Sequence, residues 1–383
     1  MATQSFPSST STQPGRFDFL DNLKWFLTML VIAHHSAIAF GASGSWYYVI
    51  PAPDGSFAPR ILSLYTGIQQ AFFMSLFFAI SAYFLVPSYD RKGARKFLLD
   101  RAKRLGIPLV VYFFFLGPTL VYMSGRFYGR INDSWPQFMS KTALDYLDGG
   151  RIGPLWFVET LLIFSVVYVG IRLLRPPPEP PRTPRPLPSP IKITGFILLL
   201  AALTFGVRII FPFGAAIAGL QLGEFPLYIA LFVLGVYAYR HYWLDQLDPK
   251  ATRPFICAAV VAIAVIAVAI ISGSMSTSAT SRGAAGLFYA LFQAVVCVGL
   301  CFFFLRLFRA RFNHSSRFSK NLTGAAYTAY IVHPFFVITV TALIAELPGG
   351  PLIHFALLAP LAITTTFAVS HVLRKLPGLR AIL

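Results

Sequence analysis

The sequence predicts an all-α, polytopic membrane protein of about ten transmembrane helices. Of its 383 residues, 56% are hydrophobic and 12% are charged, whereas a soluble domain has about 25% charged residues. Apolar runs of about 20 residues, the length of a membrane-spanning helix, recur along the whole chain. These runs do not alternate in polarity as the strands of a membrane β-barrel do, so helices are expected.

The apolar runs give ten expected spans, in the following order along the chain. They are residues 23–41, 62–86, 105–123, 155–174, 191–211, 225–240, 255–272, 286–307, 324–345 and 352–373.

The charges of the loops orient these spans, because Lys and Arg concentrate on the cytoplasmic side of a membrane. With a cytoplasmic N-terminus, 25 of the 32 Lys and Arg residues fall inside and seven fall outside. The seven are Arg60, Arg126, Arg130, Lys141, Arg151, Arg208 and Arg282. We therefore expect a multi-pass protein of the inner or plasma membrane with both termini in the cytoplasm. The same bias explains the net charge of +18 without nucleic acid as a partner.

Two segments are expected to lie outside the helices. Residues 1–15 are rich in Ser, Thr and Pro, and they lack the charged and apolar regions of a signal peptide, so a disordered tail is expected. Residues 16–383 are expected to form one membrane domain. Within it, the proline-rich residues 175–190 predict a polyproline-like cytoplasmic linker. A proline-motif binding site is the alternative for this linker.

The first span carries ionisable residues, which are costly in a membrane and therefore suggest function. Asp21 is a candidate N-cap. Lys24 and His35 are eleven residues apart, so at about 100° per residue they share one stripe of a helix, with His35 about 16 Å further in. His34 points about 100° away. A neutral imidazole at this depth can accept a proton from an alcohol, so His35 is the candidate general base. The alternative is that both histidines only bond neighbouring helices.

Three further features could bind substrate. Arg101 and Arg104 share a helix face at the cytoplasmic end of the third span and could clamp a phosphate, although lipid headgroups compete for such a pair. Glu159 is a lone acid in an apolar run, which needs a histidine, an arginine or a substrate hydroxyl as partner; a structural ion pair is the alternative. His333 precedes Pro334 at an expected kink, where it could line a cavity or belong to an aromatic core. The three cysteines show no metal or disulfide spacing, and no metal or bound cofactor is expected.

Five short patterns occur in a fixed order from residue 16 to residue 334. They are a basic residue, ten residues and a histidine (Lys24, His35); FF-x-x-S-x-x-x-L (Phe77, Phe78, Ser81, Leu85, with Ala82 where glycine is usual); R-x-x-R-L-x-x-P (Arg101, Arg104, Leu105, Pro108); LWF (Leu155, Trp156, Phe157); and Y-x-x-Y-x-x-H (Tyr327, Tyr330, His333). In these patterns the chain resembles the integral-membrane acyltransferase family 3. The stretches LDNL and GPLWFVETLLIFS are most similar to the branch of glucan-succinylating proteins.

The resemblance implies an acyl-CoA-dependent O-acyltransferase. The acyl-CoA would be a cytoplasmic co-substrate, and the acceptor a hydroxyl of an extracytoplasmic glycan or lipid-linked sugar. His35 would be the base, and Arg101 and Arg104 would hold the donor's phosphates. Lys24 would anchor the cytoplasmic end of the same stripe and is expected to bind the donor with them. Direct transfer and an acyl-histidine intermediate are both open.

The remaining assignments concern the acceptor side. Glu159 is expected to orient the acceptor, and Trp156, Tyr330 and His333 are expected to line the substrate site. Two other classes compete with an enzyme. A proton-coupled transporter or flippase would also use a membrane histidine, but no internal repeat is evident. A sensor or scaffold would use the proline-rich linker and would not depend on His35.

Overall fold

The computed structural model describes residues 17–148, 152–175, 184–274, 282–379 and 382. The predicted tail, residues 1–15, lies outside the described residues, as do residues 176–183 of the proline-rich linker. Within the described residues every extended element is helical, and the only strand-like pairing is an isolated bridge between Ile217 and Leu220. The predicted all-α class is therefore confirmed.

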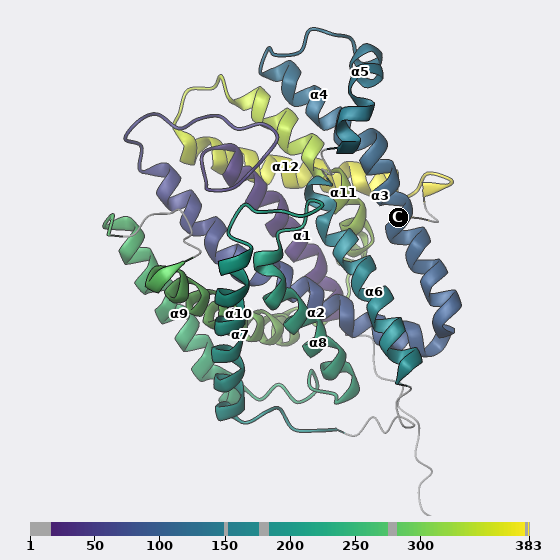
Figure 1. Cartoon of the computed structure of the whole chain (residues 1–383), viewed down its shortest axis with the longest axis vertical. Coiled ribbons are helices and arrows are strands. Elements are labelled where there is room, and N and C mark those ends of the chain that lie inside the picture. Colours follow the sequence, from purple (N-terminus) through teal and green to yellow (C-terminus); the bar gives the residue numbers. More distant parts are fainter. Residues whose placement is uncertain (1–16, 149–151, 176–183, 275–281, 380–381, 383) are drawn as a thin grey trace, which may run out of the picture.

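Helix α1 (Asp18–Ala39) lies inside the bundle, where it packs against α2 (Ala58–Arg101), α10 (Gly283–Arg311), α11 (Arg317–Ile344) and α12 (Pro351–Leu373) (Figure 1). The other helices are α3 (Ile107–Val111), α4 (Gly117–Phe127), α5 (Trp135–Asp148), α6 (Trp156–Leu174), α7 (Pro190–Ile210), α8 (Phe225–Arg240) and α9 (Pro249–Ile271). Because α1 has helices on several sides, its polar side chains face protein rather than lipid.

Eight helical stretches of the described chain are long and apolar enough to cross a membrane. One of them, Ala58–Phe127, has 70 residues and contains both the second and the third expected span. Helix α1 is not among the eight, because Lys24 and two histidines lower its mean hydropathy. A total of ten thus requires that α1 crosses the membrane and that residues 58–127 cross it twice, and both remain predictions.

The long stretch changes direction at Gly93. This residue interrupts α2 with φ 71° and ψ 169°, a conformation that glycine adopts without the steric cost of a side chain. Further along are two π-helical turns, residues 102–106 at the start of the third expected span and residues 112–116 within it. Single π turns inside helices frequently accompany functional sites.

The helix starts follow local sequence signals, with one correction. Asp248 caps α9 by accepting a hydrogen bond from the backbone N–H of Lys250 (2.9 Å), and Ser316 and Ser319 form a capping box at α11. The prediction of Asp21 as an N-cap is wrong, because α1 begins three residues earlier and Phe17 occupies the cap position. Asp21 instead lies in the first turn, where a negative charge is favourable to the helix dipole.

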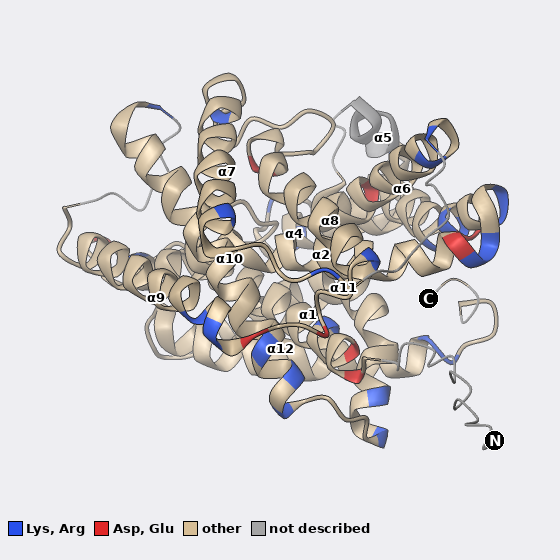
Figure 2. Cartoon of the chain, turned by 90° about the horizontal axis from the view of Figure 1, so that it is seen from below, with Lys and Arg blue, Asp and Glu red and all other residues tan. Residues whose placement is uncertain are grey.

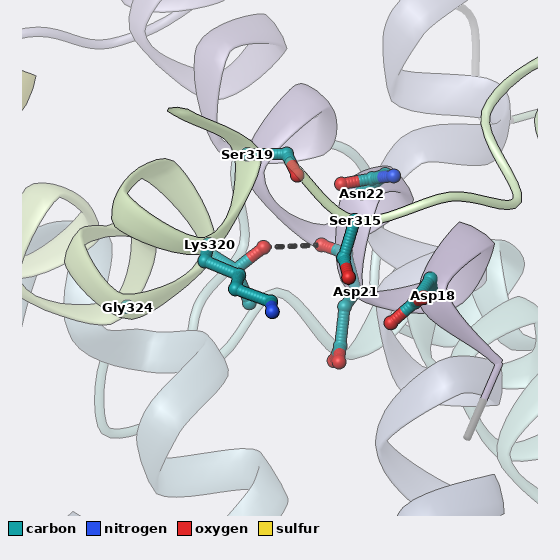
Figure 3. A pocket seen from close by; sticks show the side chains of 8 residues that line it. Asp18, Asp21, Asn22, Ser315, Ser319, Lys320 and Gly324 are labelled. Atoms are coloured by element: carbon teal, nitrogen blue, oxygen red, sulfur yellow. Dashed lines mark hydrogen bonds between the residues drawn. The ribbon is translucent and has the colours of Figure 1, made fainter. Parts of the chain in front are cut away.

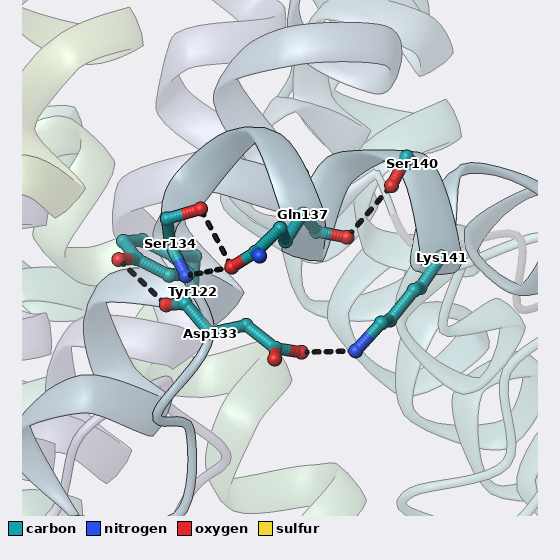
Figure 4. Close-up of polar contacts among 6 residues, drawn as sticks. All are labelled: Tyr122, Asp133, Ser134, Gln137, Ser140 and Lys141. Carbon is teal, nitrogen blue, oxygen red and sulfur yellow. Dashed lines mark hydrogen bonds and ion pairs between the residues drawn. The ribbon is translucent and has the colours of Figure 1, made fainter.

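The loops and charges lie at the ends of the bundle. Helices α4 and α5 lie at one end and residues 184–189 at the other (Figure 1). In the view from below, most of the helical ribbon is uncharged, and Lys and Arg gather at helix ends and connections (Figure 2). Helix α5 lies in a segment with no expected span. Asp133, in the loop before α5, contacts both neighbouring helices: its carbonyl accepts a hydrogen bond from Tyr122 of α4 (3.2 Å) and its carboxylate accepts one from Lys141 of α5 (2.9 Å) (Figure 4).

Candidate active site

Two histidines from distant parts of the chain meet between α1 and α11. The Nδ1 atom of His35 lies 3.1 Å from the Nε2 atom of His333, and the two rings are nearly parallel, with centroids 5.1 Å apart. The structure therefore brings together the predicted base and one of the residues predicted to line the substrate site. The two lie 298 positions apart in the sequence.

Pro334 explains how the ring of His333 is held. A proline inside a helix has no N–H, so the carbonyl four residues earlier loses its helical hydrogen bond. Here that carbonyl belongs to Tyr330, and the Nδ1 atom of His333 lies 2.7 Å from it. The His-Pro pair thus frees a backbone acceptor and supplies its replacement donor one position away. Helix α11 continues through Pro334 from Arg317 to Ile344.

These contacts select one tautomer for each ring. A carbonyl oxygen only accepts, so His333 carries its proton on Nδ1, and a neutral ring then has a lone pair on Nε2. His333 is fully buried, and the pair has no ion pair with a carboxylate among the described residues, so the neutral form is favoured. His35 must therefore donate from Nδ1 to His333. A neutral His35 then carries its lone pair on Nε2, which is what a general base needs.

His35 is also the accessible member of the histidine group. His333 has no exposed surface and His34 is 8% exposed, whereas His35 is only partly buried. The ring of His34 is held by the side chain of Gln69, which lies 3.2 Å from its Nδ1 atom, and Gln69 in turn donates to the hydroxyl of Tyr65 (2.7 Å). His34 thus has a structural hydrogen bond on the neighbouring helix α2, and the two adjacent histidines have different surroundings.

Trp46 completes the group and was not anticipated from the sequence. Its ring lies on that of His35, with centroids 4.0 Å apart and planes 19° from parallel, and it is 5.9 Å from the ring of His333. Trp46 belongs to the loop between α1 and α2, where the only available signal was an aromatic Trp-Tyr-Tyr run. An aromatic face against an imidazole can stabilise the ring when it becomes positively charged.

Arg101 and Arg104 lie at the start of the third expected span, and Arg104 is in the first π-helical turn. The side chain of Arg104 is exposed, and that of Arg101 lies against the ring of Phe97 (5.1 Å). Neither guanidinium group has a hydrogen bond or ion pair with another described side chain. The hydroxyl of Tyr327 donates to the backbone carbonyl of Arg104 (2.7 Å). Tyr327 and His333 both belong to α11 and lie about two turns apart. Helix α11 therefore links the arginine segment to the histidine pair.

Lys24 is already occupied by other groups. Its ammonium lies 2.7 Å from the Asp21 carboxylate and 4.4 Å from the ring centroid of Phe84. A small pocket of about 140 Å³ lies beside this end of α1 and carries charges of both signs (Figure 3). Its lining residues are Asp18, Asp21, Asn22, Ser315, Ser319, Lys320, Thr323 and Gly324. None of the predicted substrate-binding residues lines this pocket.

Glu159 and Trp156 lie near the start of α6 and have no contact with the histidine pair among the interactions of the described residues. The Oε2 atom of Glu159 is buried and has no hydrogen-bond partner there. Trp156 stacks on Tyr228 of α8, with centroids 5.3 Å apart. Tyr330 lies closer to the pair, because its ring centroid is 6.0 Å from that of His333 and its hydroxyl bonds the carbonyl of Pro154.

A second cavity, which we call the arginine groove, lies between the ends of α9 and α10. It has a volume of about 900 Å³. Its lining includes Arg253, Arg306, Arg309 and Arg311. Arg306 and Arg309 donate to backbone carbonyls of residues 244–249, which ties the two helices together. The arginine groove was not predicted as a site.

Residues 17–373 match a family model, Acyl_transf_3, whose description is acyltransferase domain. The chain belongs to acyltransferase family 3. It is 26% identical over 264 residues to glucans biosynthesis protein C of Salmonella gallinarum, and the match covers 67% of each chain. Proteins of the same name from Salmonella schwarzengrund and Salmonella typhimurium match with the same identity and coverage. The family region contains both members of the histidine pair, Trp46 and the arginine segment, so this multi-pass membrane protein is an acyltransferase by family.

Proposed function

We propose that this protein is an integral-membrane O-acyltransferase in which His35 acts as the general base. The observation that supports this role is the chain of contacts from the Tyr330 carbonyl through His333 to His35, which leaves the Nε2 lone pair of His35 available. His333 is then a positioning residue, because it fixes the tautomer of the base. In serine proteases a carboxylate performs that service for the catalytic histidine.

The proposed reaction is direct transfer. The acceptor hydroxyl gives its proton to Nε2 of His35 as its oxygen attacks the carbonyl carbon of a thioester. The carbon–sulfur bond then breaks, and the leaving thiolate takes the proton back from His35. The products are an ester and a free thiol, so atoms and charges balance. While His35 carries the proton, the hydrogen bond to His333 and the face of Trp46 stabilise its charge.

We propose acyl-CoA as the donor and place it on the cytoplasmic side. Arg101 and Arg104 support this, because their guanidinium groups are not paired with described side chains and suit phosphate oxygens. In this orientation the chain crosses an inner or plasma membrane ten times, with both termini in the cytoplasm. The distribution of the 32 Lys and Arg residues predicts this arrangement.

The acceptor is proposed to be a glycan or a lipid-linked sugar outside the cytoplasm. The name of the Salmonella relatives, glucans biosynthesis protein C, supports this class. Glu159 is proposed to orient the acceptor hydroxyl, since its buried Oε2 atom has no partner among the described residues. A proton-coupled transporter is not favoured, because the family match covers residues 17–373 and describes an acyltransferase.

The test is acyl transfer by the purified protein in lipid nanodiscs. Acetyl-CoA and succinyl-CoA are supplied with a glucan oligosaccharide, and mass spectrometry detects the acylated product and the free thiol. We expect His35→Ala to abolish transfer. The matched control is His34→Gln, which alters the adjacent histidine but keeps a side-chain amide for Gln69, and this variant should retain activity. Full activity of His35→Ala would exclude His35 as the base.

A further inference from the structure

The loop that carries Trp46 is fixed by several hydrogen bonds. The hydroxyl of Ser124 bonds the carbonyl of Tyr47, and the hydroxyls of Tyr47 and Tyr112 lie 2.9 Å apart. Two residues further, at Val49, the hydroxyl of Tyr128 accepts from the backbone N–H (2.7 Å) and donates to the carbonyl (3.0 Å). These bonds hold the positions directly after Trp46 against α4 and the second π-helical turn. The indole is thus held on the histidine pair by a built scaffold.

The indole N–H has no partner. The Nε1 atom of Trp46 is buried, and no described residue accepts a hydrogen bond from it. A buried donor without an acceptor costs about 1–3 kcal/mol, so such groups are uncommon and call for an explanation. A packing role alone would be met by phenylalanine, which has the ring without the donor. The N–H of Trp46 is therefore available to an acceptor that binds from outside the chain.

The position of this donor suits the reacting carbonyl. The ring of Trp46 lies 4.0 Å from that of His35, and an acceptor oxygen bound to the Nε2 atom of His35 would lie next to the carbonyl carbon that it attacks. Two other donors near the pair already have partners, because the hydroxyl of Tyr330 bonds the carbonyl of Pro154 and the amide of Gln69 donates to Tyr65. The Trp46 N–H has no partner among the described residues, so it is the donor that we assign to the oxygen of the acyl group.

We propose that the indole N–H of Trp46 donates a hydrogen bond to the carbonyl oxygen of the acyl group and stabilises the oxyanion that forms on it. This inference rests on the proposed acyl transfer and adds the hydrogen-bond donor that stabilises the negative charge on the carbonyl oxygen. When the acceptor oxygen attacks, the carbonyl electron pair moves onto the oxygen facing Trp46, and it returns when the carbon–sulfur bond breaks. A fixed donor at this position stabilises the transition state more than the ground state.

The chain provides a matched control. The Nε1 atom of Trp243 is also buried without a partner among the described residues, and its ring stacks on that of Tyr237. The ring of Trp243 also lies near that of His241, which follows the end of α8, and among the interactions of the described residues it has no contact with His35 or His333. Trp243→Phe therefore removes the same chemical group from a position away from the histidine pair.

The experiment compares kcat and the donor KM of Trp46→Phe and Trp243→Phe in nanodiscs. Trp46→Phe should lower kcat about 100-fold with an unchanged donor KM, as removal of one oxyanion donor does in other enzymes. Trp243→Phe should keep both constants. Trp46→His, which restores a ring N–H, should recover part of kcat. A kcat of Trp46→Phe within twofold of the unchanged protein, or equal losses in both variants, would overturn the proposal.

A second variant removes the effect of any folding defect. Benzothienylalanine at position 46 has the shape of tryptophan with sulfur in place of the N–H, so it keeps the stack on His35. It should lower kcat as Trp46→Phe does, with an unchanged melting temperature; a normal kcat would overturn the proposal. Absence of acyl transfer by the unchanged protein would instead contradict the proposed function, so the two failures are distinguishable.

Discussion

His35 illustrates how little of a residue's chemistry lies in the residue itself. Its imidazole could carry the proton on either nitrogen, and only one choice leaves Nε2 free. Two contacts determine the tautomer of His35. The Tyr330 carbonyl, which lacks its helical partner because of Pro334, binds Nδ1 of His333, and Nε2 of His333 binds Nδ1 of His35. A neutral imidazole stabilises a neighbouring positive charge less than a carboxylate does. The partial exposure of His35 and the face of Trp46 compensate for part of that difference.

The phosphate contact can be tested at single arginines. Arg104→Ala should raise the donor KM about 10- to 100-fold and leave kcat unchanged, because hydrogen bonds to charged groups contribute about 1.5–3 kcal/mol. Arg253→Ala is the matched control, since Arg253 is also exposed but lines the arginine groove. Initial rates at varied acyl-CoA concentration measure both constants. A KM that rises in Arg253→Ala and stays constant in Arg104→Ala would place the phosphates in the arginine groove instead.

The sequence allowed the prediction of single residues where a local rule applied. The spacing from Lys24 distinguished His35 from His34, and the His-Pro pair drew attention to His333. The hydrogen bond between the two histidines joins residues 298 positions apart, so no local pattern could predict it. Trp46 lies in a loop without periodicity, where its stacking depends on contacts with α4. Lys24 was predicted to hold the donor, but its nearest partner, Asp21, could not be recognised because the helix start was misplaced.

At the scale of the element, the proline inside α11 affects the site through the hydrogen bond of His333. Pro334→Ala restores a backbone N–H that competes with His333 for the Tyr330 carbonyl. The ring of His333 then loses its fixed tautomer, and kcat should fall up to about tenfold, the equivalent of one neutral hydrogen bond. The helix itself should become more stable, because proline inside a helix costs up to about 3 kcal/mol relative to alanine. Activity and melting temperature are measured on the same samples.

The control for this substitution is Pro360→Ala in α12. Pro360 also lies inside a long helix, but its side chain is exposed and the residue before it is Ala359, not a histidine. It should raise the melting temperature without lowering kcat. If Pro334→Ala were as active as Pro360→Ala, the freed carbonyl would have no role in setting the base.

Helices could be predicted from the sequence where an apolar run coincided with a residue that favours a helix start. Pro190 and Pro351 stand at the first positions of α7 and α12, close to the expected starts at 191 and 352. The two π-helical turns were not predictable, because a π turn has no pattern of its own and depends on how the helix packs. Helix α5 was also missed, since it is too short and too polar to be recognised as a span.

At the scale of the whole molecule, the number of membrane crossings depends on residues 58–127 and on α1. A straight helix of 70 residues would be about 105 Å long, more than three times the thickness of a hydrocarbon core of about 30 Å. Gly93 interrupts this stretch, and it lies within residues 90–104, a segment rich in Lys, Arg and Asp. Two crossings are therefore expected for residues 58–127. Helix α1 is expected to cross as well, because the surrounding helices shield its histidines from lipid.

Cysteine labelling in intact cells tests this arrangement directly. Asp54, Arg91, Asn132 and Lys375 are exposed and lie between or after the disputed spans. In a background with the exposed Cys257 replaced by alanine, Asp54→Cys and Asn132→Cys should react with a membrane-impermeant maleimide. Arg91→Cys and Lys375→Cys should react only after permeabilisation, since cations remain on the cytoplasmic side. Residues 58–127 crossing once would put positions 54 and 132 on opposite sides, and the cytoplasmic site proposed for acyl-CoA at Arg104 would then have to be abandoned.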